Sequence, residues 1–121
     1  MIGETTTMNI LLIEPGKPPR PTEIPQTLSA MQHLVGGYIQ VLYPFDDPVA
    51  LVCNEEGKLK GLPLNRALRD EAGTIYDIIS GPFFLCGAPL DSEDFADLTD
   101  EQLKRYYDQF RLVELYFKAQ T

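Results

Sequence analysis

The chain has 121 residues, of which 44% are hydrophobic and 23% are charged, and its formal net charge is −8. This length predicts one domain that buries a core without disulfides or metals, and the acidic balance argues against direct binding to a nucleic-acid backbone. No apolar run approaches the roughly 20 residues that span a bilayer, and the first residues, MIGETTT, lack the features of a signal peptide. The sequence therefore predicts a cytoplasmic protein without a membrane segment.

The first predicted strand is the β-type run MNILLIE at residues 8–14, which ends at the turn-forming Pro15 and Gly16. Residues 1–7 precede this run, and we interpret them as an upstream extension or a remnant of cloning. We expect residues 8–121 to form a single α+β domain. The next segment is held extended and cannot be a helix or a central strand, because it contains Pro18, Pro19, Pro21 and Pro25.

A helix is predicted from Leu28, with Thr27 as its N-cap and Gly36 and Gly37 as its end. Residues 38–43 and 49–54 then have the composition of strands. The run VALVC is apolar on both faces, so residues 49–54 should form a central strand.

Beyond Asn54 the sequence predicts a tight turn at residues 55–57, with Gly57 at positive φ, and a return strand through residues 58–60. Residues 65–70 are predicted to form one helical turn, and residues 70–73 a polar loop. Two further strands, at residues 74–79 and 83–86, are separated by a bend at residues 80–82. Together these elements predict an α+β fold with a small mixed, mainly antiparallel sheet, one helix after the first strand and a long C-terminal helix.

The C-terminal helix has the clearest signal. Thr99 and Gln102 form a capping box, and Leu98 and Leu103 a hydrophobic staple. We predict a helix from about residue 99 to about residue 118, roughly 30 Å long. Its final turns either project from the domain or mediate a homodimer. The predicted apolar face consists of Leu103, Tyr107, Phe110, Val113 and Phe117.

No assembled catalytic, metal or cofactor signature is present. Cys53 and Cys86 each lie in an apolar run, which predicts buried thiols; a disulfide between neighbouring strands is the alternative. His33, the single histidine, lies off the apolar stripe of its helix and is expected at the surface. The carboxylate pairs at residues 46–47 and 55–56 should lie at opposite ends of one strand, too far apart to share a metal ion. We therefore predict no catalytic residue, no metal ion and no cofactor.

Two sets of polar residues are candidate sites. The loop before the last helix carries a run of acids without a basic residue, which suggests a surface for a protein partner, a surface that imitates DNA, or simply a solvated loop. The second set would bind and polarise a small polar ligand if the fold brought its members together, although turn formation explains its asparagines as well. The acidic set is Asp91, Glu93, Asp94 and Asp97, and the second set is Asn54, Glu55, Asn65 and Arg66.

Four runs of the sequence resemble the domain-of-unknown-function family 3846: MNILLIEPGK, VGGYIQVLYPFDDPVALVCNEEGKLKGLPLNRALRD, YDIISGPFFLCG and DSEDFADLTDEQLKRYYDQF. The resemblance covers roughly residues 8–111. It implies a bacterial origin, in accessory proteins of mobile elements and phages of Firmicutes, and it supplies no catalytic residues.

Two functional hypotheses follow. The first is a non-enzymatic binding or regulatory accessory module of a mobile element, with an unknown protein partner. The second is a small enzyme or ligand-binding domain that uses the set Asn54, Glu55, Asn65 and Arg66.

Overall fold

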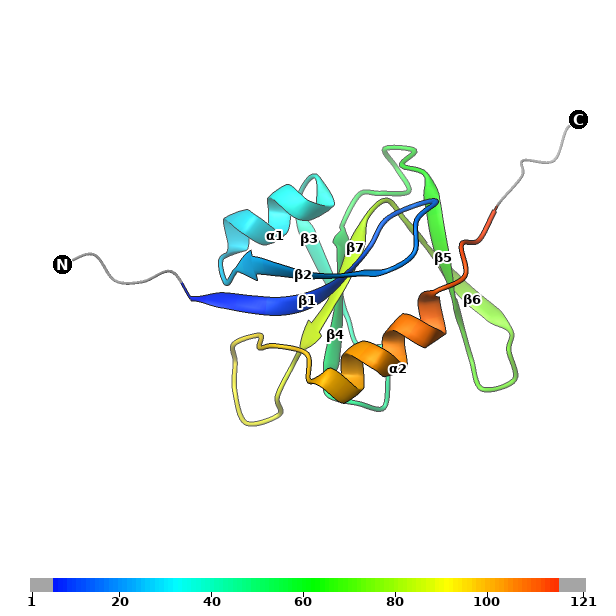
Figure 1. Ribbon diagram of the computed structural model, residues 1–121. Coiled ribbons are helices and arrows are strands. Elements are labelled where there is room, and N and C mark those ends of the chain that lie inside the picture. Colours follow the sequence, from blue (N-terminus) through cyan, green and yellow to red (C-terminus); the bar gives the residue numbers. More distant parts are fainter. Residues whose placement is uncertain (1–5, 116–121) are drawn as a thin grey trace, which may run out of the picture.

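Figure 1 shows the computed structural model, which describes residues 6–115. In chain order the elements are β1 (Thr7–Ile13), β2 (Arg20–Pro25), α1 (Leu28–Val35), β3 (Ile39–Leu42), β4 (Val49–Asn54), β5 (Leu64–Arg69), β6 (Ile75–Ser80), β7 (Phe83–Gly87) and α2 (Asp100–Phe110). Five strands form an antiparallel sheet in the order β2-β1-β7-β4-β3, and β5 pairs with β6 in a separate antiparallel hairpin. The prediction of an α+β fold is confirmed, but the strands form two antiparallel sheets instead of one mixed sheet.

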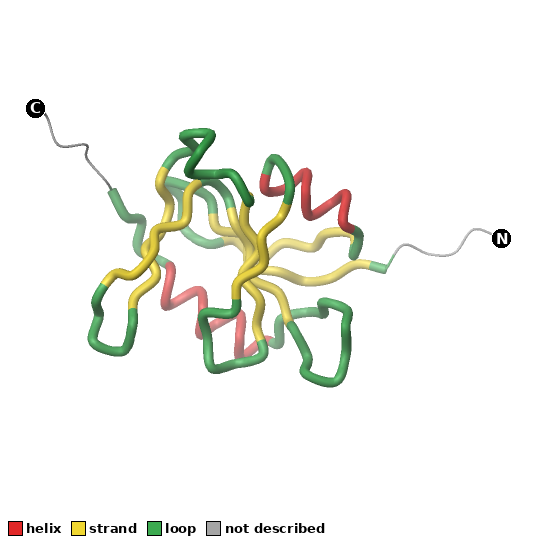
Figure 2. Tube along the Cα trace, turned by 180° about the vertical axis from the view of Figure 1, so that it is seen from behind, coloured by secondary structure: helices red, strands yellow, loops and turns green. Residues whose placement is uncertain are grey.

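The five-stranded sheet is covered on both faces, with α1 on one side and α2 on the other (Figure 1). The β5–β6 hairpin lies beside the large sheet, on the side of α2 (Figure 2). Alternate residues of each strand point to opposite faces. In β4, Val49, Leu51 and Cys53 therefore pack toward α2, whereas Ala50 and Val52 pack toward α1. This explains why VALVC is apolar throughout, and it confirms β4 as a central strand.

Helix α1 begins and ends where the sequence predicts. The Thr27 hydroxyl accepts a hydrogen bond from the Ala30 N–H at 3.1 Å, and Gly36 adopts the left-handed conformation at the C-cap. The sequence did not predict β2, so α1 follows the second strand and not the first. Because β2 is an edge strand, it tolerates Pro21 and Pro25, which a central strand would exclude.

The segment after β4 differs from the prediction. Residues 58–60 belong to a turn, because β4 is already paired on both sides, with β3 and β7, and offers no free edge. Gly57 does not have a positive φ; Gly61 does, at 67°. The predicted helical turn at residues 65–70 is also wrong, because these residues lie almost entirely within β5. The polar loop at residues 70–73 is confirmed as a turn in which Gly73 has a positive φ.

Helix α2 has the predicted capping box but only 11 residues, and it ends at Phe110. Its buried side chains are Tyr106 and Phe110, whereas Tyr107, assigned to the apolar face, is exposed. The helix ends where Phe110 O accepts a hydrogen bond from the buried Arg66 of β5, at 3.0 Å. Val113 follows outside the helix, and Phe117 lies outside the described residues, so the homodimer through the final turns stays a prediction. Neither helix within residues 6–115 is long and apolar enough to cross a membrane.

Candidate functional site

A pocket of about 380 Å³ lies between the large sheet and β6. We call it the β6 pocket. It opens on the face of the sheet that carries α2, because Cys53 and Ile79 in its wall belong to the hydrophobic cluster of that face. Its volume is within the range of small-molecule sites. The lining residues are Gln40 and Leu42 of β3, Cys53 and Asn54 of β4, Glu55, Gly57, Lys58 and Leu59 of the turn, and Asp77, Ile78, Ile79 and Ser80 of β6.

Ser80 contributes a buried polar atom without a partner to this pocket. Its residue surface is only 5% exposed, and Ser80 Oγ has no hydrogen bond among the described residues. Gly57 packs directly on the same residue, since a Cβ at Gly57 would lie 2.7 Å from Ser80 O. Burying a hydroxyl group without a hydrogen bond costs roughly 1–3 kcal/mol. Ser80 therefore lines the pocket and carries a buried hydroxyl group that makes no hydrogen bond to the described residues.

Charged side chains also line the β6 pocket. Lys58, on the turn, donates a hydrogen bond to Asp77 Oδ1 of β6, and the two form an ion pair. The same oxygen accepts a hydrogen bond from the Ile78 N–H at 2.8 Å. Glu55 is exposed and adds a second carboxylate. The lining therefore carries two carboxylates against one ammonium group.

Cys53 is a protonated thiol at neutral pH. Burial, and secondarily the charge of Asp77, raise the pKa of Cys53 to about 11, although Lys58 acts in the opposite direction. The nucleophilic form of cysteine is the thiolate, so this thiol is not activated. Cys86 packs on the opposite face of the sheet, where burial raises its pKa to about 12. Both cysteines are free and buried, which confirms the prediction; the alternative of a disulfide between them is wrong because they lie on opposite faces.

The structure brings two of the four candidate ligand-binding residues to the β6 pocket. Asn54 and Glu55 line it, whereas Asn65 and Arg66 lie on β5 and do not. Asn54 also fixes the turn, because its side chain donates to Val35 O at 3.1 Å and accepts from the Glu56 N–H at 2.8 Å.

Asn65 and Arg66 are buried and tie β5 to distant segments. Asn65 donates to Ile13 O and to Gly81 O, at 2.9 Å each. Arg66 donates to Asn65 Oδ1 at 2.8 Å, to Lys17 O at 2.7 Å and to Phe110 O at 3.0 Å. These donors point into the protein. Asn65 and Arg66 therefore stabilise the fold, although the sequence suggested that they bind a ligand.

The acidic loop before α2 is anchored at one end. Asp97 Oδ1 accepts a hydrogen bond from the Asn9 N–H at 2.6 Å, and Ala96 pairs with Gly87. Asp91, Glu93 and Asp94 are exposed. Two of these acids, Glu93 and Asp94, border a second hollow of about 420 Å³ together with Met8, Met31 and Phe95.

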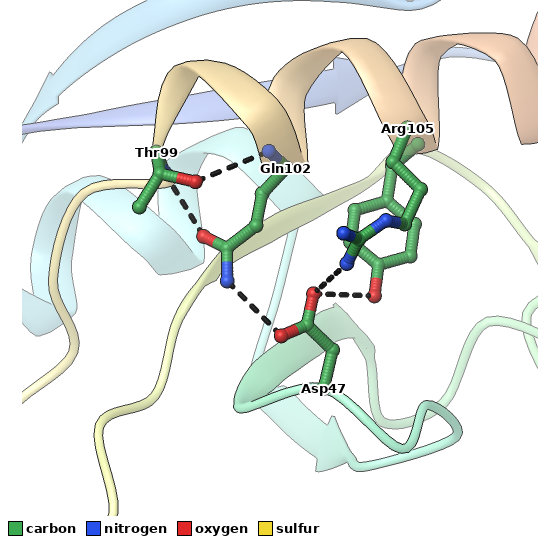
Figure 3. Close-up of polar contacts among 5 residues, drawn as sticks. Asp47, Thr99, Gln102 and Arg105 are labelled. Carbon is green, nitrogen blue, oxygen red and sulfur yellow. Dashed lines mark hydrogen bonds and ion pairs between the residues drawn. The ribbon is translucent and has the colours of Figure 1, made fainter.

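Asp47 has a role that the sequence did not reveal. It lies in the loop between β3 and β4 and accepts hydrogen bonds from three side chains of α2 (Figure 3). The distances are 3.3 Å from Gln102 Nε2, 2.6 Å from an Arg105 guanidinium nitrogen and 3.1 Å from the Tyr106 hydroxyl. Asp47 thus anchors α2 to the loop between β3 and β4, a role that its membership of a carboxylate pair in the sequence did not indicate.

His33 is exposed on α1 and does not line the β6 pocket. Within residues 6–115, no three His, Cys, Asp or Glu side chains are grouped so that they could hold a metal ion. Sequence spacing could not reveal the β6 pocket, since its walls come from separate segments. The one local signal is Asp77, a carboxylate inside the apolar run IYDII.

A search of the curated proteins and a search of the solved structures each returned no match. The family model described as a domain of unknown function, DUF3846, matches residues 8–111, which run from β1 to the end of α2. The chain therefore belongs to the DUF3846 family.

Proposed function

We propose that this chain is a non-enzymatic binding module, and that its ligand is a small polar molecule held in the β6 pocket. The observation that carries the proposal is Ser80, which lines the pocket and whose buried hydroxyl group has no hydrogen-bond partner among the described residues. Proteins retain such a group where function compensates for its cost in stability.

The chemistry of the pocket supports binding more than catalysis. The Cys53 thiol is protonated at neutral pH, because its pKa is about 11. The single histidine, His33, is on the helix that covers the other face of the sheet. The described pocket lining therefore contains no nucleophile paired with a histidine base.

Ser80→Ala separates a ligand-binding role from a structural one. A structural serine would lose stability on truncation, whereas removal of an unpartnered hydroxyl should leave stability unchanged or raise it by about 1 kcal/mol. The ligands are to be found by an NMR screen of polar metabolites, as compounds that shift the signals of Gln40, Lys58 and Asp77. The variant should bind these ligands more weakly than the wild type does. Ser29→Ala, at an exposed position of α1, is the matched control. A clear loss of stability in Ser80→Ala, with unchanged ligand binding, would contradict the proposal.

A second candidate is a protein partner of the acidic loop. Glu93 and Asp94 border a hollow with Met8, Met31 and Phe95, a combination of acidic and apolar groups that suits a basic partner with an apolar side chain.

The proposal includes an origin in a bacterial mobile element, which the resemblance implies, and a cytoplasmic location, which suits two reduced thiols.

Charge reversal of Asp91 and Asp94 to lysine tests the second candidate in a pull-down from a host that carries the element. Asp97 stays unchanged, because its carboxylate holds the Asn9 backbone. The variant should lose the partner and keep its ligand in the β6 pocket. Recovery of the same partner by the variant would exclude the loop as the binding surface.

A further inference from the structure

We propose that the free edge of β3 binds an extended, basic segment of another protein, which pairs with β3 as an additional strand of the large sheet. The binding groups are the backbone N–H and C=O groups of this edge, so the segment does not require a ligand in the β6 pocket.

Strand β3 has an unpaired edge. It is the last strand of the large sheet and pairs with β4 alone among the described strands. The Glu55 N–H donates to Tyr38 O at 2.8 Å, which makes these two residues a hydrogen-bonded pair of the β3–β4 register. Because hydrogen-bonded pairs alternate with other pairs along antiparallel strands, the backbone groups of Ile39, Val41 and Tyr43 point away from β4. None of these groups has a hydrogen bond within the described part of the chain.

The opposite edge of the same sheet, at β2, is closed to strand addition. The Gln26 N–H donates to Thr6 O at 2.8 Å, in register with the β1–β2 pairing. By the same alternation, Pro21, Glu23 and Pro25 point away from β1. The two prolines have no N–H to offer, and a charged residue at an edge disfavours further pairing.

The β5–β6 hairpin also has N–H groups that are already bound by carboxylates. The Ala67 N–H of β5 donates to Glu114 at 2.8 Å, and the Ile78 N–H of β6 donates to Asp77 at 2.8 Å. Proteins block exposed edges because an unpaired edge attracts other strands. By contrast, β3 has the sequence IQVL, with neither a charged residue nor a proline. An edge that stays open where the other described edges are blocked indicates a site for strand addition.

The charge around this edge favours a basic segment. Glu55 and Glu56, the residues that follow β4, lie at the start of β3. Lys60 offsets one of these two carboxylates, because its Nζ is 3.4 Å from the position of a Cβ on Gly37. Asp46, which is exposed, follows the other end of β3 in the loop to β4. A strand with a basic residue at each end therefore meets opposite charge at both ends.

A second copy of the chain fits this edge less well. If two copies of β3 paired antiparallel, Asp46 of one copy would lie toward Glu55 of the other. Like charges placed opposite each other destabilise strand pairing, and two chains that each carry a net charge of −8 would meet. A basic segment has neither conflict.

Three peptides with acetylated and amidated ends test the site in NMR titrations of the full chain: KVTVTVK, EVTVTVE, and KVTVTVK that is N-methylated at every inner residue. KVTVTVK should bind, and the acidic peptide should bind more weakly. The methylated peptide keeps the side chains and charges but lacks the N–H groups, so it should not bind. KVTVTVK should slow hydrogen exchange at the Ile39 and Val41 amides. The Gln40 and Leu42 amides, which face β4, should change little.

Substitutions in the protein separate the backbone contribution from that of charge. Val41→Pro removes an outward N–H group and should weaken KVTVTVK about tenfold, whereas Val41→Thr keeps this group and should leave binding unchanged. Asp46→Lys should weaken KVTVTVK and strengthen the acidic peptide. Glu71→Lys makes the same change in charge in the turn between β5 and β6, at an exposed residue, and should leave both affinities nearly unchanged.

Three results would overturn the proposal. The first is equal binding of the methylated and unmethylated peptides, which requires no change in the protein and would show that charge alone attracts them. The second is a dimer in sedimentation that Val41→Pro dissociates, which would assign the edge to a second copy. The third is the absence of any shift at Ile39 and Val41 with KVTVTVK at millimolar concentration. The polar ligand of the β6 pocket is tested separately, by the metabolite screen and Ser80→Ala.

Discussion

The Tyr106 hydroxyl of α2 donates a hydrogen bond of 3.1 Å to Asp47, which lies 59 positions earlier in the loop before β4. Phe45, in the same loop, packs on the Tyr106 ring with centroids 4.6 Å apart. Burial, followed by the hydrogen bond and charge of Asp47, raises the pKa of Tyr106 to about 12, although Arg105 acts in the opposite direction. The loop therefore holds α2 against the sheet through both a polar and an aromatic contact.

Asp47→Ala should lower the free energy of unfolding by about 1–3 kcal/mol, because it leaves the buried Tyr106 hydroxyl without its acceptor. Urea denaturation measures the change. Asp46→Ala, at the exposed neighbouring residue, should stay within about 0.5 kcal/mol of the wild type. In the background of Asp47→Ala, Tyr106→Phe should cost less than it does in the wild type. Equal costs in both backgrounds would show that the two residues are not coupled.

Arg66→Met should be among the most destabilising changes in the protein. The buried guanidinium donates to Lys17 O, Asn65 Oδ1 and Phe110 O, so its loss leaves several acceptors without a donor. We expect a loss of about 3–5 kcal/mol, as for other broken buried polar networks. Arg20→Met removes an exposed pair with Glu14 and should cost less than about 1 kcal/mol. Similar losses in the two variants would contradict the structural role of Arg66.

Both thiols should resist alkylation by iodoacetamide at pH 8 until the protein unfolds in urea. The pKa values of about 11 for Cys53 and about 12 for Cys86 leave little thiolate in the folded state. Because these values are raised above the ordinary value of 9.0, the folded state keeps protons that the unfolded state releases. The thiol contribution to stability is therefore intact below pH 9 and falls as the pH rises toward 11 and 12.

Cys53, in the wall of the β6 pocket, should react before Cys86, and a bound ligand should slow its reaction. Mass spectrometry of the alkylated peptides distinguishes the two sites. Rapid labelling of both cysteines in the folded protein at pH 8 would contradict their burial.

Local signals in the sequence identify the elements that depend on local contacts. The capping box of Thr99 and Gln102 marks the start of α2, and Thr27 marks the start of α1. The end of α2 and the strand β5 depend on Arg66, whose partners lie 44 and 49 positions away. The pattern of hydrophobic residues contains no signal for such contacts. The same limit applies to the β6 pocket, where β3, β4, the turn and β6 each contribute a wall.

Two aromatic residues of α2 that lie three positions apart differ in burial. Phe110, the last residue of α2, is buried, and its ring packs on Phe83 with centroids 5.8 Å apart. Phe110→Ala should therefore lower the free energy of unfolding by about 3–5 kcal/mol. Tyr107 is 39% exposed, so Tyr107→Ala should cost about 1 kcal/mol or less. Urea denaturation of both variants measures the difference, and equal costs would indicate that Tyr107 belongs to the buried face of α2, as the sequence pattern alone predicts.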